Sequence, residues 1–238
     1  MTNQFKKKKK KLCLYQWVLE NKMTNKVVLS YHDTVLHQSD IAILQGSDWL
    51  NDEIIAFYLE YLEREVYPNK GMLFISPQVT QCLKQVQKED LKIFLDPILS
   101  SSHHHILFAL NDSDSLDKPG GSHWSLLIYN RTNDEYFHAD SFQGTNSREA
   151  TKLAHNLHSY FNPAETNQPP FVKQVITAQQ KNGYDCGLYL LANLEMAVKA
   201  VQAGRRLDEL HIDQTLIKSK RASILSLIYL LQRKHGPK

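Results

Sequence analysis

The sequence predicts an α+β fold, because strand-like segments gather in the middle of the chain and helical patterns lie on either side of them. Apolar runs typical of strands occupy residues 106–110 and 123–141, whereas apolar residues at helical spacing occupy residues 49–66 and 213–233. A chain of 238 residues can bury one substantial core, and no internal repeat or proline- and glycine-rich linker follows residue 26. One folded domain is therefore expected.

Three helices are predicted before the strands. Residues 49–66 carry a stripe of apolar side chains, and the polar pair Asn51–Asp52 opens this helix. Residues 76–86 form the second helix, with Pro77 in the first turn. Proline is tolerated there because a backbone N–H at that position would have no partner within the helix. Residues 91–95 form a short third helix.

The rest of the chain alternates between strands and helices. The expected elements are a buried strand at 106–110, a polar loop at 111–121, a hairpin at 123–141, a helix at 148–161, a strand at 171–176, a helix from Cys186 to about Val201, and an amphipathic helix at 213–233.

The predicted hairpin brings a histidine and an aspartate together. Two strand-like runs, 123–129 and 135–141, flank a short polar turn, which is typical of antiparallel pairing. If the hairpin folds about Thr132, the numbers of paired residues add up to about 264. His123 then lies within one residue of direct opposition to Asp140, at a Cβ separation of about 5 Å. The aspartate can accept the imidazole N–H and fix its tautomer.

Cys186 is the candidate nucleophile. It ends the polar, turn-prone segment 179–187 and is followed by an apolar run, which places it where a loop becomes a helix. Unpaired N–H groups and the helix dipole stabilise a thiolate there, and a base partner makes it a controlled nucleophile. The alternatives are a Cys186 that is only a small buried apolar residue, and a base that is His138 rather than His123.

These motifs resemble the Ulp/sentrin-specific protease family, whose members are cysteine proteases that cleave ubiquitin-like modifiers. In that family the nucleophile lies in an Asp-Cys-Gly segment, the base in a His-Trp pair and the acid on the following strand, which match Cys186, His123 and Asp140. Its oxyanion glutamine, six residues before the cysteine, matches Gln180, with Gln179 as the neighbouring alternative.

A further family signature, Trp-Leu-Asn-Asp before a helix, is found at residues 49–52. The resemblance implies that Trp49 and Trp124 form a narrow slot around a Gly-Gly tail and that Asp52 meets a basic modifier residue or the local backbone. Core packing is the alternative role of both tryptophans. Segments 28–31, 74–77, 94–97 and 109–112 and Tyr184 resemble the deneddylase branch in particular.

By this resemblance the domain from 27 to 235 is a monomeric catalytic domain with a papain-like fold, in which helices flank a central mixed sheet. The predicted function is cleavage after the C-terminal Gly-Gly of a ubiquitin-like modifier, either in conjugates (deneddylation) or in the modifier precursor. A SUMO-specific isopeptidase, and a non-hydrolytic relative that binds the modifier or transfers acyl groups, are the alternatives.

Composition restricts the other function classes. Without the six lysines of Lys6–Lys11, the formal charge of +3 becomes −3, so the body offers no stripe for nucleic acid. Three cysteines without paired spacing argue against disulfides and fit a reducing compartment, the cytoplasm or the nucleus. No apolar run approaches the ~20 residues of a membrane span. His103–His105 lacks further ligands, so neither a metal nor a cofactor is expected.

Residues 1–26 are predicted to be a basic, disordered extension. A nuclear address or a tail that seeks acidic surfaces is the alternative role of its lysines. Residues Met23–Asn25 repeat Met1–Asn3, so Met23 is an alternative start.

Overall fold

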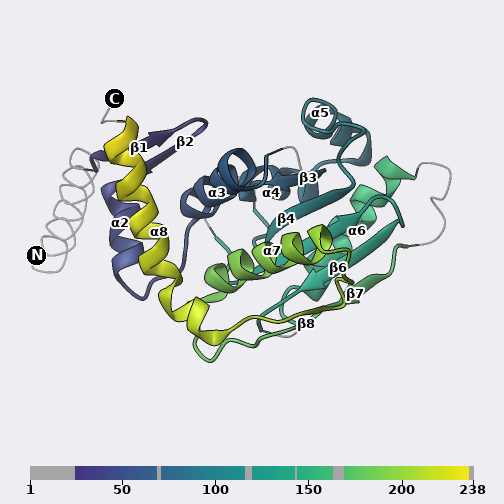
Figure 1. Cartoon of the computed structure of the whole chain (residues 1–238). Helices are drawn as coiled ribbons and strands as arrows, with labels where there is room; N and C mark the ends of the chain where they lie inside the picture. The colour runs from purple at the N-terminus through teal and green to yellow at the C-terminus, as the bar shows by residue number, and fades with distance from the viewer. Residues whose placement is uncertain (1–24, 69–70, 116–119, 143, 163–168, 236–238) are drawn as a thin grey trace, which may run out of the picture.

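The computed structural model describes residues 25–68, 71–115, 120–142, 144–162 and 169–235. A five-stranded sheet with the order β3-β4-β5-β6-β7 lies at its centre (Figure 1). The middle pairs are antiparallel and the outer pairs, β3 with β4 and β6 with β7, are parallel, so the predicted mixed sheet is confirmed. Its strands are β3 (Met72–Ile75), β4 (His105–Asn111), β5 (Trp124–Asn130), β6 (Glu135–Ala139) and β7 (Val172–Gln174).

Helices cover both faces of this sheet (Figure 1). On one face, α3 and α7 pack against the strands with Leu107 and Ala109 of β4, while Ile106 and Phe108 of the same strand point to the other face. The strand is therefore a continuous apolar run, as expected for a sheet buried on both sides. The helices are α3 (Asp52–Tyr61) and α7 (Cys186–Gln202) on the first face, and α4 (Pro77–Gln85), α5 (Leu91–Leu95) and α6 (Ser147–Phe161) on the second.

The two ends of the described chain pack together. Helix α2 (Gln38–Gln45) lies along α8 (Gln214–His235), and α8 also contacts the strand β1 (Val27–Tyr31) (Figure 1). A second strand, β2 (Thr34–His37), completes a hairpin with β1. The predicted extension lies outside the described residues over 1–24.

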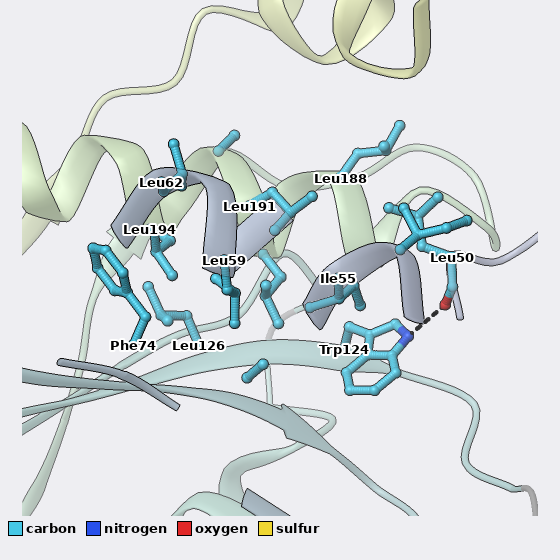
Figure 2. Packing of buried hydrophobic residues seen from close by; sticks show 14 of the residues in the cluster. Leu50, Ile55, Leu59, Leu62, Phe74, Trp124, Leu126, Leu188, Leu191 and Leu194 are labelled. Carbon is cyan, nitrogen blue, oxygen red and sulfur yellow. Dashed lines mark hydrogen bonds between the residues drawn. The ribbon is translucent and has the colours of Figure 1, made fainter. Parts of the chain in front are cut away.

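The core beneath α3 and α7 reaches the site discussed below (Figure 2). Leu188 and Leu191 of α7 pack with Ile55 and Leu59 of α3. The indole of Trp124 lies at the edge of this cluster, and its Nε1 donates a hydrogen bond to the carbonyl of Leu50 at 2.9 Å. The apolar stripe of the predicted 49–66 helix is therefore a core stripe, and Asn51 caps the helix by accepting a bond from the Ile54 N–H.

The predicted helices and the central strands are confirmed, with small changes at their ends. The helix predicted over 49–66 begins at Asp52 and continues from Leu62 as a π-helical turn, η1 (Leu62–Val66). The strand predicted over 171–176 is two strands: β7 pairs with β6, whereas β8 (Ile176–Thr177) pairs with β9 (Glu209–Leu210) in a separate sheet. Helix α2, strands β3 and β9 and the β1–β2 hairpin were not predicted; a short 3₁₀ turn, η2 (Lys88–Asp90), precedes α5.

The predicted register of the 123–141 hairpin is wrong by one residue. Leu126 pairs with Ala139, so the numbers of paired residues add up to 265 rather than 264. The reason is the turn, which has four residues between the strands and is therefore centred after Thr132. A shift of one residue changes the face on which a side chain lies. The observed register places His123 and Asp140 on the same face, two residues from direct opposition.

Candidate active site

A cavity of about 690 Å³ opens at the end of the sheet where β5 begins and α7 starts. Cys186 and His123 line it together with Trp49, Trp124 and Asp52. All three predicted substrate-binding residues therefore meet the predicted nucleophile and base in one hollow. Residues of helix α4 and of the segment 120–122 also line it.

Cys186 is the first residue of α7, as predicted, and its side chain is buried. The first N–H groups of a helix have no partner within the helix, so they point positive charge towards the sulfur. The preceding loop is shaped by Asn182, whose Oδ1 accepts bonds from the N–H groups of Tyr184 and Asp185 at 3.1 and 3.0 Å. Gly187 allows the helix to lie close to Leu50, because a Cβ there would meet the leucine side chain at 2.9 Å.

His123 and Asp140 form a buried pair, with His123 Nε2 at 2.5 Å from Asp140 Oδ1. Burial lowers the pKa of His123, but its hydrogen bonds to Asp140 and Cys186 and their negative charges raise this pKa to about 9. Because Nε2 faces Asp140, Nδ1 is the ring nitrogen left for the thiol. An imidazole with this pKa holds a proton at neutral pH, as an imidazolium–thiolate pair requires.

Asp140 is kept ionised by its surroundings. Burial raises the pKa of its carboxyl, but hydrogen bonds from His123 and from the N–H groups of Phe142 and Asn146 outweigh burial and lower it below its usual range. The two N–H bonds measure 2.9 Å to Oδ1 and 3.1 Å to Oδ2. Since a charged carboxylate can only accept, it determines which ring nitrogen of His123 carries the proton.

His138, the rival base, is engaged elsewhere. Its Nε2 lies 2.9 Å from the Ser125 hydroxyl and its Nδ1 lies 3.0 Å from Gln174 Oε1. The ring is completely buried, and burial lowers its pKa. Both nitrogens thus have partners within the protein, which favours His123 over His138 as the candidate base.

Gln180 is held in the loop before Cys186. The Ser141 hydroxyl donates to its Oε1 at 2.8 Å, and its Nε2 donates to the Asn182 carbonyl at 2.8 Å. The side-chain amide of Gln179 instead donates to the carbonyls of Asp140 and Thr177. Gln180 keeps one amide hydrogen free of these bonds, so of the two glutamines it is the better candidate for the oxyanion donor.

The two tryptophans have different surroundings. Trp49 is 48% exposed, and its Nε1 donates to the Gly183 carbonyl, in the loop before Cys186, at 2.5 Å. Trp124 is 5% exposed and packs mainly in the core. Asp52 is exposed at the start of α3, but the surrounding protein partly desolvates its carboxyl and raises its pKa. The core alternative therefore holds for most of the Trp124 ring but not for Trp49.

Arg221 of α8 holds the nucleophile loop against the segment before α3. Its guanidinium donates to Asp185 Oδ1 at 3.1 Å and to the Asp48 carbonyl at 2.7 Å. A third bond, 2.9 Å long, reaches the Ile43 carbonyl at the end of α2. The residues that immediately precede Trp49 and Cys186 are thus tied to the last helix.

Asp112, which was not predicted as a site residue, fixes the backbone ahead of the base. Its carboxylate accepts bonds from the N–H and hydroxyl of Ser122 and, at 3.0 Å, from the His123 N–H. These bonds lower the pKa of Asp112 although burial raises it. No local pattern indicates this role, because Ser122 and His123 come 10 and 11 residues after Asp112.

Gly121 has to be glycine for Asp112 to reach these partners. Its φ is +88°, and a Cβ there would lie 1.8 Å from Asn111 Oδ1. We expect Gly121→Ala to destabilise the protein and to lower kcat, because either the loop or Asn111 has to move. Thermal melts and steady-state kinetics measure the two effects.

Gly144→Ala is the matched control for that variant. Gly144 has the same φ of +88°, but a Cβ added there would meet no atom within 4 Å. The free energy of unfolding of the control should fall only by what an alanine costs in a left-handed backbone, roughly 1–2 kcal/mol. Equal losses of stability and of kcat in the two variants would contradict the steric argument.

Among the described residues, no group of three or more histidine, cysteine, aspartate or glutamate side chains is placed to hold a metal ion. His103–His105 form no such group, and the described helices include none long and apolar enough to cross a membrane.

The model of the Ulp1 protease family, C-terminal catalytic domain, matches residues 48–230. The chain belongs to the Ulp1 protease family. It is therefore a cysteine peptidase, and the family resemblance of its motifs is confirmed. The grouping of Cys186 with His123 and Asp140 has the composition that a nucleophile with its base and acid requires.

Relatives of the Ulp1 family are similar in sequence to this chain over most of its length. Sentrin-specific protease 8 of Rattus norvegicus is 35% identical over 213 residues, which cover 88% of this chain and 97% of that protein. NEDD8-specific protease 1 of Arabidopsis thaliana is 32% identical over 211 residues, covering 84% and 92%. The crystal structure of the Ulp1 protease domain in complex with Smt3, the yeast ortholog of SUMO, shares the fold, with a TM-score of 0.67 at 21% identity, covering 87% and 88%.

Proposed function

We propose that this Ulp1-family protease is a deneddylase, which cleaves after the C-terminal Gly-Gly of NEDD8 in conjugates, in the precursor, or in both. The observation that carries the chemistry is the buried His123–Asp140 pair beside Cys186, in a cavity whose mouth is bordered by Trp49. The relatives named for NEDD8 or as sentrin-specific protease 8 support the choice of modifier.

The reaction follows from the positions of these groups. The Cys186 thiolate attacks the carbonyl of the modifier's last glycine, and the C–S bond forms as the carbonyl becomes an oxyanion. The N–H of Cys186 and the amide of Gln180 donate to this oxygen. Protonated His123 gives its proton to the leaving amine as the C–N bond breaks. Water then attacks the thioester, His123 takes its proton, and the thiolate and the free carboxylate are released.

The cavity fits a tail without side chains. Trp49 lines the cavity together with Cys186, and its indole is bonded to the loop that carries Cys186, so we propose that the indole narrows the approach to the sulfur. An extended Gly-Gly segment passes where a bulkier residue would meet the indole. Because modifiers of this class share such a tail, the slot selects for the tail and not for the modifier.

Selectivity is therefore expected from the surface that meets the folded body of the modifier. We place this surface at the start of α3 and in the 111–122 loop. Burying one unpaired charge there costs a few kcal/mol, enough for a preference of about a hundredfold. Values of kcat/KM for matched fluorogenic C-terminal conjugates should rank NEDD8 above SUMO and ubiquitin. Equal rates, or SUMO ahead, would overturn the proposed modifier but not the protease.

A SUMO-specific isopeptidase is the second candidate, since the Ulp1 domain crystallised with Smt3 has the same fold. The same kinetic comparison separates the two. An acyltransferase or a binding module is disfavoured by the intact set of Cys186, His123, Asp140 and Gln180. We further propose that the protein acts as a monomer on modifier conjugates, without nucleic acid, in the cytoplasm or the nucleus.

A further inference from the structure

The backbone of His123 lies just outside the sheet. Strand β5 begins at Trp124, whose partner Asn111 ends the ladder with β4. Ladder hydrogen bonds therefore do not position the base, although its ring must meet both Asp140 and Cys186. Side chains take over this task on both sides of the residue.

Asn146 holds the carbonyl side. Its Nδ2 donates to the His123 carbonyl at 3.2 Å and to the Ser125 hydroxyl at 3.0 Å, and its backbone N–H donates to Asp140 Oδ2 at 3.1 Å. One completely buried residue therefore contacts both members of the catalytic pair. Asp112 holds the other side by accepting the His123 N–H, as described above.

The position of Asn146 would normally serve a different purpose. It is the N-cap residue of α6, where an asparagine side chain usually accepts a bond from an N–H of the first helical turn. Here the side chain makes no such bond, and its Oδ1 is buried without a partner among the described residues. A helix cap is given up and a buried acceptor is left unpaired, both of which cost stability. In place of a capping bond, the side chain makes the bonds to the His123 carbonyl and the Ser125 hydroxyl.

A chain of hydrogen bonds beneath the site fixes the direction of the amide. His138 donates its Nδ1–H to Gln174 Oε1, so its Nε2 accepts the Ser125 hydroxyl hydrogen. The Ser125 oxygen is then an acceptor, as is the His123 carbonyl. Only the Nδ2 side of Asn146 satisfies both.

We propose that Asn146 and Asp112 are positioning residues that hold the backbone of His123 between them, the amide at its carbonyl and the carboxylate at its N–H. The inference rests on the proposed function only for the substrate, because the arrangement of Cys186 and His123 can be measured without any modifier.

The test compares Asn146→Ala with Asn156→Ala in the full chain. Asn156 lies on the same helix, and its Nδ2 also donates to two carbonyls, those of Leu83 and Lys84 at the end of α4, so neither bond involves His123 or Asp140. A misplacement of about 1 Å in a catalytic group costs on the order of 100-fold. We expect Asn146→Ala to lower kcat by roughly 10- to 100-fold with KM within about twofold, and Asn156→Ala to keep the wild-type kcat.

A second measurement is the rate at which iodoacetamide alkylates Cys186, followed on its own peptide across pH. Asn146→Ala should slow this reaction near neutral pH and change its pH profile, whereas Asn156→Ala should not. If Asn146→Ala does not fold, Asp112→Ala tests the other half with the same two measurements. Wild-type kcat and alkylation in a folded Asn146→Ala or Asp112→Ala variant would overturn the inference. A wild-type protein that alkylates normally but cleaves no NEDD8 conjugate would overturn the proposed substrate alone.

Discussion

Cys186→Ala is expected to abolish turnover while the protein still binds NEDD8. The thiol is the only group at the start of α7 that can form the thioester, and losing a nucleophile costs about 10⁴- to 10⁶-fold in comparable hydrolases. Binding should persist because the cavity walls do not depend on the sulfur. Single-turnover kinetics measure the first effect, and calorimetric titration with NEDD8 measures the second.

Cys82→Ala is the matched control. Cys82 lines the same cavity from α4, and its thiol is also free, but it is not at a helix start. This variant should turn over substrate at the wild-type rate. Hydrolysis by Cys186→Ala at a comparable rate would disprove the mechanism.

Asp140→Asn should leave the fold largely intact and lower kcat by about 10²- to 10⁴-fold. An amide at this position no longer fixes the tautomer of His123, and it removes the negative charge that supports the imidazolium. The pKa of His123, about 9 in the native protein, should then fall, because burial lowers it and only Cys186 remains to raise it.

The ion pair needs a protonated His123, so the alkaline limb of kcat/KM should lie near pH 9 in the wild type and move to lower pH in Asp140→Asn. Asp134→Asn provides the control, since Asp134 lies 3.8 Å from His158 in an Asp–His pair outside the site. An unchanged alkaline limb in Asp140→Asn would exclude Asp140 as the acid.

Much of the fold could be predicted because its longer elements carry a clear period. The 17 residues of α7 and the 15 of α6 are long enough for the apolar pattern to settle their type. The missed elements are short. Strand β3 has four apolar residues, too few to distinguish a strand from a helix, and the β1–β2 turn places His32 at φ +46° without the glycine or asparagine that usually marks it.

The sequence predicts the residues of the candidate site, but it does not predict the residues that hold them in place. Cys186, His123, Asp140 and Gln180 lie in recognisable motifs. In the fold, Cys186 and His123 line one cavity, Asp140 is bonded to His123, and Gln180 lies in the loop before Cys186. Asp112 and Asn146 act on His123 from 11 and 23 residues away, so no local pattern connects them to it. The hairpin register depended on the centre of one turn, which composition does not locate to a single residue.

The contact between Arg221 and Asp185 has a consequence for the order of synthesis. The nucleophile loop is translated before its guanidinium partner, which comes 36 residues later. A nascent chain therefore contains His123, Asp140 and Cys186 while Asp185 still lacks its cation and α2 has not yet received α8. We expect the ribosome-bound chain to be a poor protease, so that the enzyme becomes competent only when its last helix docks.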